Sequence, residues 1–76
     1  MKSIRYDRHA KRRMKEREVT EEETEMAINN PDYIEPSIKG RKNAYKFIGS
    51  RFLRVTFKEE IENILVIESV ARTFFK

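Results

Sequence analysis

The chain has no cysteine and no tryptophan, and it has a single histidine, His9, among its 76 residues. Without cysteine there can be no disulfide framework, no thiolate metal site and no cysteine nucleophile. A structural zinc site normally takes four cysteine or histidine ligands, which one imidazole cannot provide. We therefore expect neither a metal nor another cofactor.

Long apolar segments are missing as well. No apolar run approaches the roughly 18 residues of a membrane-spanning helix. The start, Met1–Arg5, leads straight into charge and lacks the apolar stretch of a secretory signal. These features predict a cytoplasmic protein without membrane contact. The length allows one domain, 1–76, and such a domain buries only roughly 60% of its unfolded surface, which favours a function at the surface.

Charge is abundant and arranged in blocks behind a formal net charge of +4. Residues 1–17 hold eight basic and two acidic side chains, and residues 18–35 hold seven acidic side chains and no basic one. Residues 36–58 hold seven basic side chains and no acidic one, before four acidic and two basic side chains in 59–76. Either opposite blocks pair in the fold, or the two basic blocks form one face that holds phosphates.

Two helices are expected first. The first runs over Arg8–Glu16 with Asp7 as its N-cap. The second begins after Thr20, which forms a capping box with Glu23, and it stops at residues 29–31, Asn-Asn-Pro.

Four strands are expected to follow, over Tyr33–Ile38, Asn43–Ile48, Arg51–Phe57 and Ile64–Arg72. Pro36 marks the first of them as an edge strand, and the last, apolar on both faces at its start, is expected to be central. Gly49-Ser50 fits a two-residue hairpin turn. This order predicts an α+β domain with two N-terminal helices packed on one face of a four-stranded antiparallel sheet.

The third of these strands alternates. Leu53, Val55 and Phe57 are expected to face the helices, and Arg54 the open side of the sheet. Glu68 and Arg72 share a parity on the last strand, so they are expected on the open side as well.

Residues 6–20, YDRHAKRRMKEREVT, resemble the H-A-x-x-R-M-x-x-R opening of a small uncharacterised prokaryotic domain family near the RelE/BrnT-like toxins. The resemblance continues through NNPD at 29–32, KNAYK at 42–46 and LVIESVAR at 65–72. It implies a RelE-like fold and a type II toxin–antitoxin setting. In that setting the protein cleaves RNA, often bound to the ribosome, and a cognate antitoxin protein neutralises it.

Metal-free RNA cleavage needs a base for the 2′-hydroxyl proton, cations around the phosphorus centre and an acid for the leaving oxygen. Imidazole exchanges protons most readily near neutrality, and arginine matches phosphate geometry. The catalytic candidates are therefore His9, Arg12, Arg54 and Arg72. The candidates for nucleic-acid binding are Arg13, Arg17, Lys39, Arg41, Lys42, Tyr45 and Lys46.

Structural roles compete with these assignments. His9 could simply pair with Asp7 or Glu16, the helix arginines could pair with the acidic block, and Tyr45 could fill the core or the sheet surface. Few aromatic side chains are expected to remain for base stacking. No role is assigned to the tail that contains Phe74-Phe75.

Three functions stay open at this point. The first is a toxin-like, metal-independent endoribonuclease. The second is a non-catalytic nucleic-acid-binding module, whose binding should persist in His9→Ala, whereas cleavage by the first should be lost. The third is a protein-interaction module on the same fold.

Overall fold

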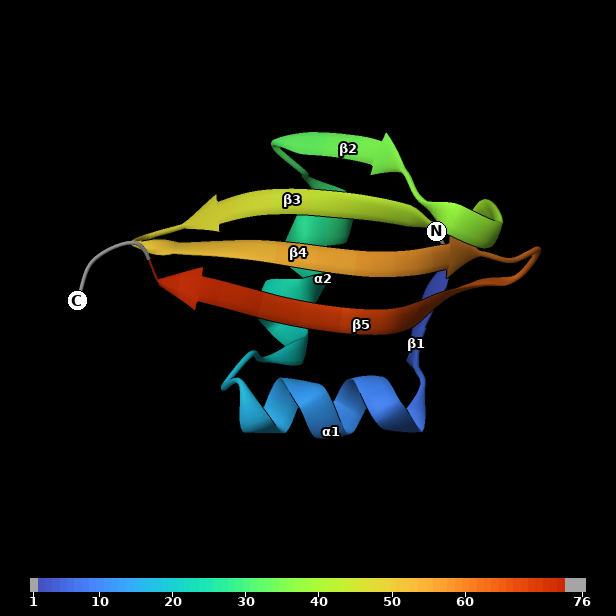
Figure 1. Cartoon of the computed structure of the whole chain (residues 1–76). Helices are drawn as coiled ribbons and strands as arrows, with labels where there is room; N and C mark the ends of the chain where they lie inside the picture. Colours follow the sequence, from blue (N-terminus) through green and yellow to red (C-terminus); the bar gives the residue numbers. More distant parts are fainter. Residues whose placement is uncertain (1, 74–76) are drawn as a thin grey trace.

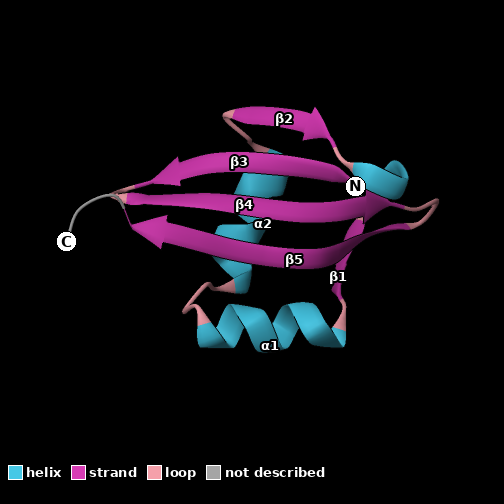
Figure 2. Cartoon of the chain, viewed as in Figure 1, coloured by secondary structure: helices cyan, strands magenta, loops and turns pink. Residues whose placement is uncertain are grey.

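A computed structural model describes residues 2–73 of the chain (Figures 1 and 2). The elements, in chain order, are β1 (Ser3–Tyr6), α1 (Arg8–Glu16), α2 (Glu21–Asn29), β2 (Tyr33–Pro36), the short 3₁₀ turn η1 (Ile38–Gly40), β3 (Lys42–Ile48), β4 (Arg51–Glu59) and β5 (Asn63–Thr73). Both helices keep their expected bounds and caps: the Asp7 side chain accepts from the His9 backbone N–H, and the capping box of Thr20 and Glu23 is complete. The tail that contains Phe74-Phe75 lies outside the described residues.

The sheet has five strands in the order β1-β5-β4-β3-β2, so the expected four-stranded antiparallel sheet is wrong. β2 to β5 form the expected antiparallel meander, with β2 at an edge. The additional strand is β1, which pairs parallel to β5 through Ser3–Tyr6 against Asn63–Val66. Paired residues of β1 and β5 are 60 positions apart in the sequence, as in Ser3 with Asn63. The four residues of β1 are too few for an alternating pattern that would predict a strand.

The expectation that both helices cover one face also needs correction. α2 packs across β3 and β4 and covers one face of the sheet, whereas α1 packs along β5 (Figure 1). The ladder between β1 and β5 stops at Val66, whose carbonyl accepts from the Asp7 N–H at 3.1 Å. α1 then flanks the remainder of β5. We call the sheet face opposite α2 the open face.

The core lies between α2, α1 and the sheet. One cluster of buried residues contains Ala10 of α1, Ala27 of α2 and Val55, Phe57 and Val66 of the sheet. The expected alternation of β4 is confirmed, because Leu53, Val55 and Phe57 are all buried on this side.

Two local features hold these elements together. Thr24 of α2 and Ser69 of β5, both fully buried, share a hydroxyl hydrogen bond of 2.8 Å. The predicted hairpin turn is confirmed as well: Ile48 pairs with Arg51, and Gly49 has φ +62°, a value that glycine adopts without steric cost.

α1 ends in a Schellman motif. The Val19 N–H donates to the Met14 carbonyl at 2.8 Å, and the Glu18 N–H donates to the Lys15 carbonyl at 3.3 Å. Val19 and Met14 also pack together in a buried cluster with Leu53. The motif requires a left-handed residue, and that residue is Glu18, with φ 56°. A side chain in this conformation costs about 1–2 kcal/mol relative to glycine.

We expect Glu18→Gly to raise the free energy of unfolding by about 1 kcal/mol, because glycine removes the steric cost at this position. Chemical denaturation followed by circular dichroism measures this change. Lys15→Gly is the matched control: Lys15 is exposed in the last turn of α1, where glycine should cost about 1 kcal/mol. Destabilisation by both variants would contradict the analysis.

Candidate functional site

The register of three neighbouring strands decides which side chains meet on the open face. Tyr45 of β3 lies opposite Arg54 of β4, and Arg54 lies opposite Val70 of β5. In the next row, Phe52 lies opposite Arg72. Because side chains alternate between the two faces of a strand, all of them point away from the core residues of β4.

A groove of about 490 Å³ runs between the open face and α1. We call it the arginine groove; its lining residues are Arg13, Arg17, Tyr45, Phe52, Arg54, Glu68, Val70, Ala71 and Arg72. Arg13 lies in α1 and Arg17 is the C-cap residue of that helix, whereas Arg54 and Arg72 come from the sheet. Glu68 is the one acidic residue of the lining. The flanking position of α1 is what brings the two pairs of arginines together.

Most of this positive charge is not neutralised inside the domain. Arg54 donates through Nη2 to Glu68 Oε1 at 2.9 Å. Within residues 2–73, the guanidinium groups of Arg13, Arg17 and Arg72 make no hydrogen bond or ion pair. Three planar cations therefore remain available to an anion in one groove.

A fifth arginine fixes the wall of the groove without lining it. Arg51 of β4 donates from Nη1 to the Glu23 carboxylate at 3.0 Å and from Nη2 to the carbonyls of Arg17 and Glu18 at 3.3 and 3.1 Å. The cation thus sits at the C-terminal end of α1, where it also suits the helix dipole. Arg51 thereby links α1 and α2 to β4 and fixes the backbone position of Arg17, which lines the groove.

Tyr45 is held at the floor of the groove. Its hydroxyl donates to Glu35 Oε2 of β2 at 2.5 Å. This hydrogen bond, together with partial desolvation and the negative charge of Glu35, raises the pKa of the Tyr45 phenol. On its other side the ring stacks on Phe52, with centroids 5.4 Å apart and planes 10° apart.

Five of the candidate residues come together in the groove: Arg13, Arg17, Tyr45, Arg54 and Arg72. The other two candidates on α1, His9 and Arg12, are exposed and do not line the groove.

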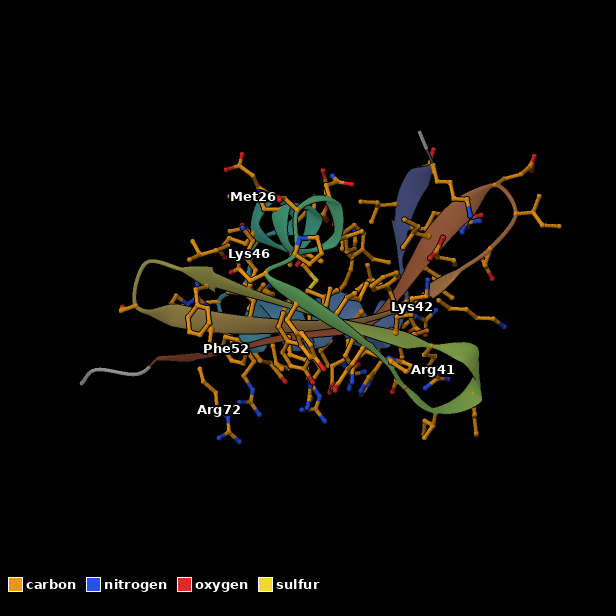
Figure 3. All side chains as sticks on the ribbon, turned by 90° about the horizontal axis from the view of Figure 1, so that it is seen from above. Met26, Arg41, Lys42, Lys46, Phe52 and Arg72 are labelled. Carbon is orange, nitrogen blue, oxygen red and sulfur yellow. The ribbon has the colours of Figure 1, made fainter. Side chains whose placement is uncertain are left out.

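The remaining lysines and Arg41 lie elsewhere. Lys46 points to the α2 side of the sheet, opposite to Arg72 (Figure 3), where it pairs with Asp32 at 3.8 Å. Lys42 pairs with Glu59 at 2.7 Å. Lys39 and Arg41 lie in and after η1, at the turn between β2 and β3.

Sequence reasoning assigned no role to Phe52 or Glu68. The alternation of β4 puts Phe52 on the open face together with Arg54, and the parity of β5 does the same for Glu68 and Arg72. The signal was therefore present for both, but their neighbours depend on the register between strands.

In the part of the chain that the structure describes, no group of three or more His, Asp or Glu side chains could hold a metal ion. No helix in this part has the length and apolar character to cross a membrane.

The chain matches the model of a known domain family. The model of a family described as "Domain of unknown function (DUF4258)" matches residues 6–70. The match takes in both helices and β2 to β4, and it ends within β5, two residues before Arg72. No curated protein and no solved structure matches the chain.

We expect the Tyr45 phenol to ionise later than an ordinary tyrosine in an ultraviolet titration of the folded protein. Tyr45→Phe should remove this late component, and Glu35→Ala should move it back toward the ordinary range. In the unfolded chain this phenol ionises at a pH of about 10, below its pKa in the folded protein. The contribution of Tyr45 to the free energy of unfolding is therefore fully present below that pH and is lost as the pH rises further. The fall in stability above this pH should be smaller in Tyr45→Phe.

Tyr6→Phe is the control for this titration. The pKa of Tyr6 is raised too, mainly by burial and then by the nearby charges of Glu25 and Glu21. Its late component must persist in Tyr45→Phe. An unchanged late absorbance in the Tyr45 variant would contradict the assignment.

Proposed function

The chain belongs to the DUF4258 family, whose description assigns no activity, and we propose from its site that the domain binds the sugar–phosphate backbone of RNA in the arginine groove. The observation that carries the proposal is that Arg13, Arg17 and Arg72 line one groove without an internal partner among residues 2–73. Guanidinium groups stay charged and bind phosphate oxygens in a bidentate manner.

The shape of the groove agrees with a polymeric anion. It is open along the sheet and its cations are spread over α1, β4 and β5, so they can contact successive phosphates of one strand. An enclosed pocket for a small metabolite would need core volume that a domain of this size lacks. The choice of RNA over DNA rests on the resemblance of the opening residues to a small domain family placed near the RelE/BrnT-like toxins.

We expect wild-type protein to bind a labelled RNA oligonucleotide with an affinity that falls steeply as salt rises, because each neutralised phosphate releases counterions. Arg13→Ala, Arg17→Ala and Arg72→Ala should each weaken binding about tenfold, and each should lower the salt slope by about 1. Fluorescence anisotropy at several salt concentrations measures both quantities.

Arg8→Ala is the matched control. Arg8 is an exposed arginine of α1 that lies outside the groove and has no ion pair among residues 2–73. It should change affinity little. Wild-type affinity in the triple variant of Arg13, Arg17 and Arg72 would overturn the proposal. Equal affinity for a DNA strand of the same sequence would support the arginine groove as a phosphate-binding site and contradict the preference for RNA.

A second candidate function is metal-independent cleavage of the bound RNA, as in a toxin-like endoribonuclease. The observation that favours it is the Glu68 carboxylate, which lies among the arginines of the groove, 2.9 Å from Arg54. In this reaction the carboxylate takes the 2′-hydroxyl proton while the 2′-oxygen attacks phosphorus. The bond from phosphorus to the 5′-oxygen breaks, and that oxygen receives a proton from water or from the Tyr45 phenol.

The products would be a 2′,3′-cyclic phosphate and a free 5′-hydroxyl. The arginines stabilise the charge that grows on the phosphate oxygens. The ribosome-bound substrate and the antitoxin partner that the resemblance implies remain predictions, and an antitoxin would cover the same groove with acidic side chains.

Cleavage of a mixed RNA pool in the presence of a metal chelator, with and without ribosomes, tests this second function. We expect Glu68→Gln to lower the rate by about 10²–10⁴-fold, and His9→Ala to leave most of it. If His9→Ala abolishes cleavage and Glu68→Gln does not, His9 and not Glu68 is the general base. Absence of cleavage by the wild type under all conditions would leave RNA binding without catalysis.

A further inference from the structure

A second hollow adjoins the arginine groove. It has a volume of about 390 Å³ and is lined by Asp32, Tyr33, Glu35, Tyr45, Phe47 and Phe52, and we call it the aromatic pocket. Tyr45 and Phe52 line both hollows, so a ligand can pass from one to the other without leaving the surface. The two hollows differ in chemistry, since the aromatic pocket contains no cation.

Rings from three neighbouring strands line this pocket. Tyr33 lies opposite Tyr45 in the register of β2 and β3, with ring centroids 5.8 Å apart. Tyr45 in turn stacks on Phe52 of β4. Tyr33 is the outermost of the three and is 60% exposed, so an aromatic side chain is available here although few were expected to remain for base stacking.

Carboxylates occupy the rim where phosphates would need cations. Asp32 accepts from the Phe47 backbone N–H at 2.8 Å, and Glu35 accepts from the Tyr45 hydroxyl at 2.5 Å. Asp32 also pairs with Lys46 on the α2 side of the sheet at 3.8 Å, so Glu35 is the carboxylate of the rim without a cationic partner among residues 2–73. Each carboxylate keeps further lone pairs for a donor. Negative charge repels a phosphate, but it accepts hydrogen bonds from the amino group of a base.

We propose that the aromatic pocket receives an unpaired, amino-bearing nucleobase of the strand whose phosphates lie in the arginine groove. The base stacks on Tyr33, and its exocyclic amino group donates to Glu35 or Asp32. Adenine, cytosine and guanine carry such a group, and uracil does not. This inference rests on the proposed function and adds to it a selection for single strands over duplex.

Selection for single strands follows from what a duplex can present. Its bases are stacked and paired, so none can enter a pocket beside the backbone. Sequence-dependent RNA recognition generally uses unstacked bases on aromatic side chains. Such stacking contributes about 1–3 kcal/mol per base.

The test compares the affinities of labelled oligo(A), oligo(U) and an RNA duplex, with oligo(dA) as the DNA arm. We expect the wild type to bind oligo(A) most tightly among the RNAs. Tyr33→Ala should weaken oligo(A) binding about tenfold and leave the duplex unchanged, which narrows the ratio between the two. Glu35→Gln should narrow the ratio of oligo(A) to oligo(U), because an amide donates where a carboxylate can only accept.

Two variants control for loss of fold. Tyr33→Phe keeps the ring and should behave like the wild type. Ile34→Ala removes the next, 45% exposed side chain of β2, which pairs with the core residue Ala44 rather than with the open face. It should leave the binding ratios unchanged.

The outcomes separate this inference from the proposed function. If the triple arginine variant loses all binding while Tyr33→Ala keeps the wild-type ratio of oligo(A) to duplex, the arginine groove stands and the base pocket is wrong. If the triple variant binds like the wild type, the proposed function itself fails. Equal effects of Tyr33→Ala on oligo(A) and oligo(dA) would support a base pocket without selection for the ribose.

Discussion

The alternation of side chains along β4 is the constraint on which the rest of the domain depends. Leu53, Val55 and Phe57 are buried beneath the helices, so Phe52 and Arg54 between them must lie on the open face. A shift of one residue in register would exchange core and site together. The strand pairing that buries the core residues therefore also places the residues of the site. Substitutions on the open face can test function with little effect on the stability of the fold.

α1 contributes residues both to the core and to the arginine groove. Its apolar residues Ala10 and Met14 are buried, while Arg13 and the C-cap residue Arg17 line the groove. This is possible because α1 flanks β5 instead of lying flat on the sheet (Figure 1). Arg51 holds its C-terminal end in that position through two backbone carbonyls and Glu23. The position of Arg17 in the site thus depends on Arg51 and on the packing of α1.

Local chemistry made the helices and the antiparallel strands predictable. Each of these features depends on only a few neighbouring residues: the caps at Asp7 and Thr20, the turn at Gly49 and the alternation of β4. The pairing of β1 with β5 was not predictable, because its two strands lie at opposite ends of the chain. The same limit applies to the site: alternation placed Arg54 and Arg72 on one face, but the proximity of Arg13 and Arg17 follows from the nonlocal position of α1. Tyr45 and Lys46 were grouped as binding candidates, although alternation puts these neighbours on opposite faces of β3.

The charge pattern acquires a physical meaning in this fold. The blocks of opposite sign do partly pair, as in Arg51 with Glu23 and Lys46 with Asp32, so charge balance explains some of the basic residues. It does not explain Arg13, Arg17 and Arg72, whose like charges repel one another across one groove without a partner among residues 2–73. An anion bound between these arginines would reduce this repulsion. In the proposed complex, the carboxylates of the adjoining aromatic pocket would repel the phosphates, so a nucleotide strand would lie with its phosphates over the arginines and a base toward Tyr33.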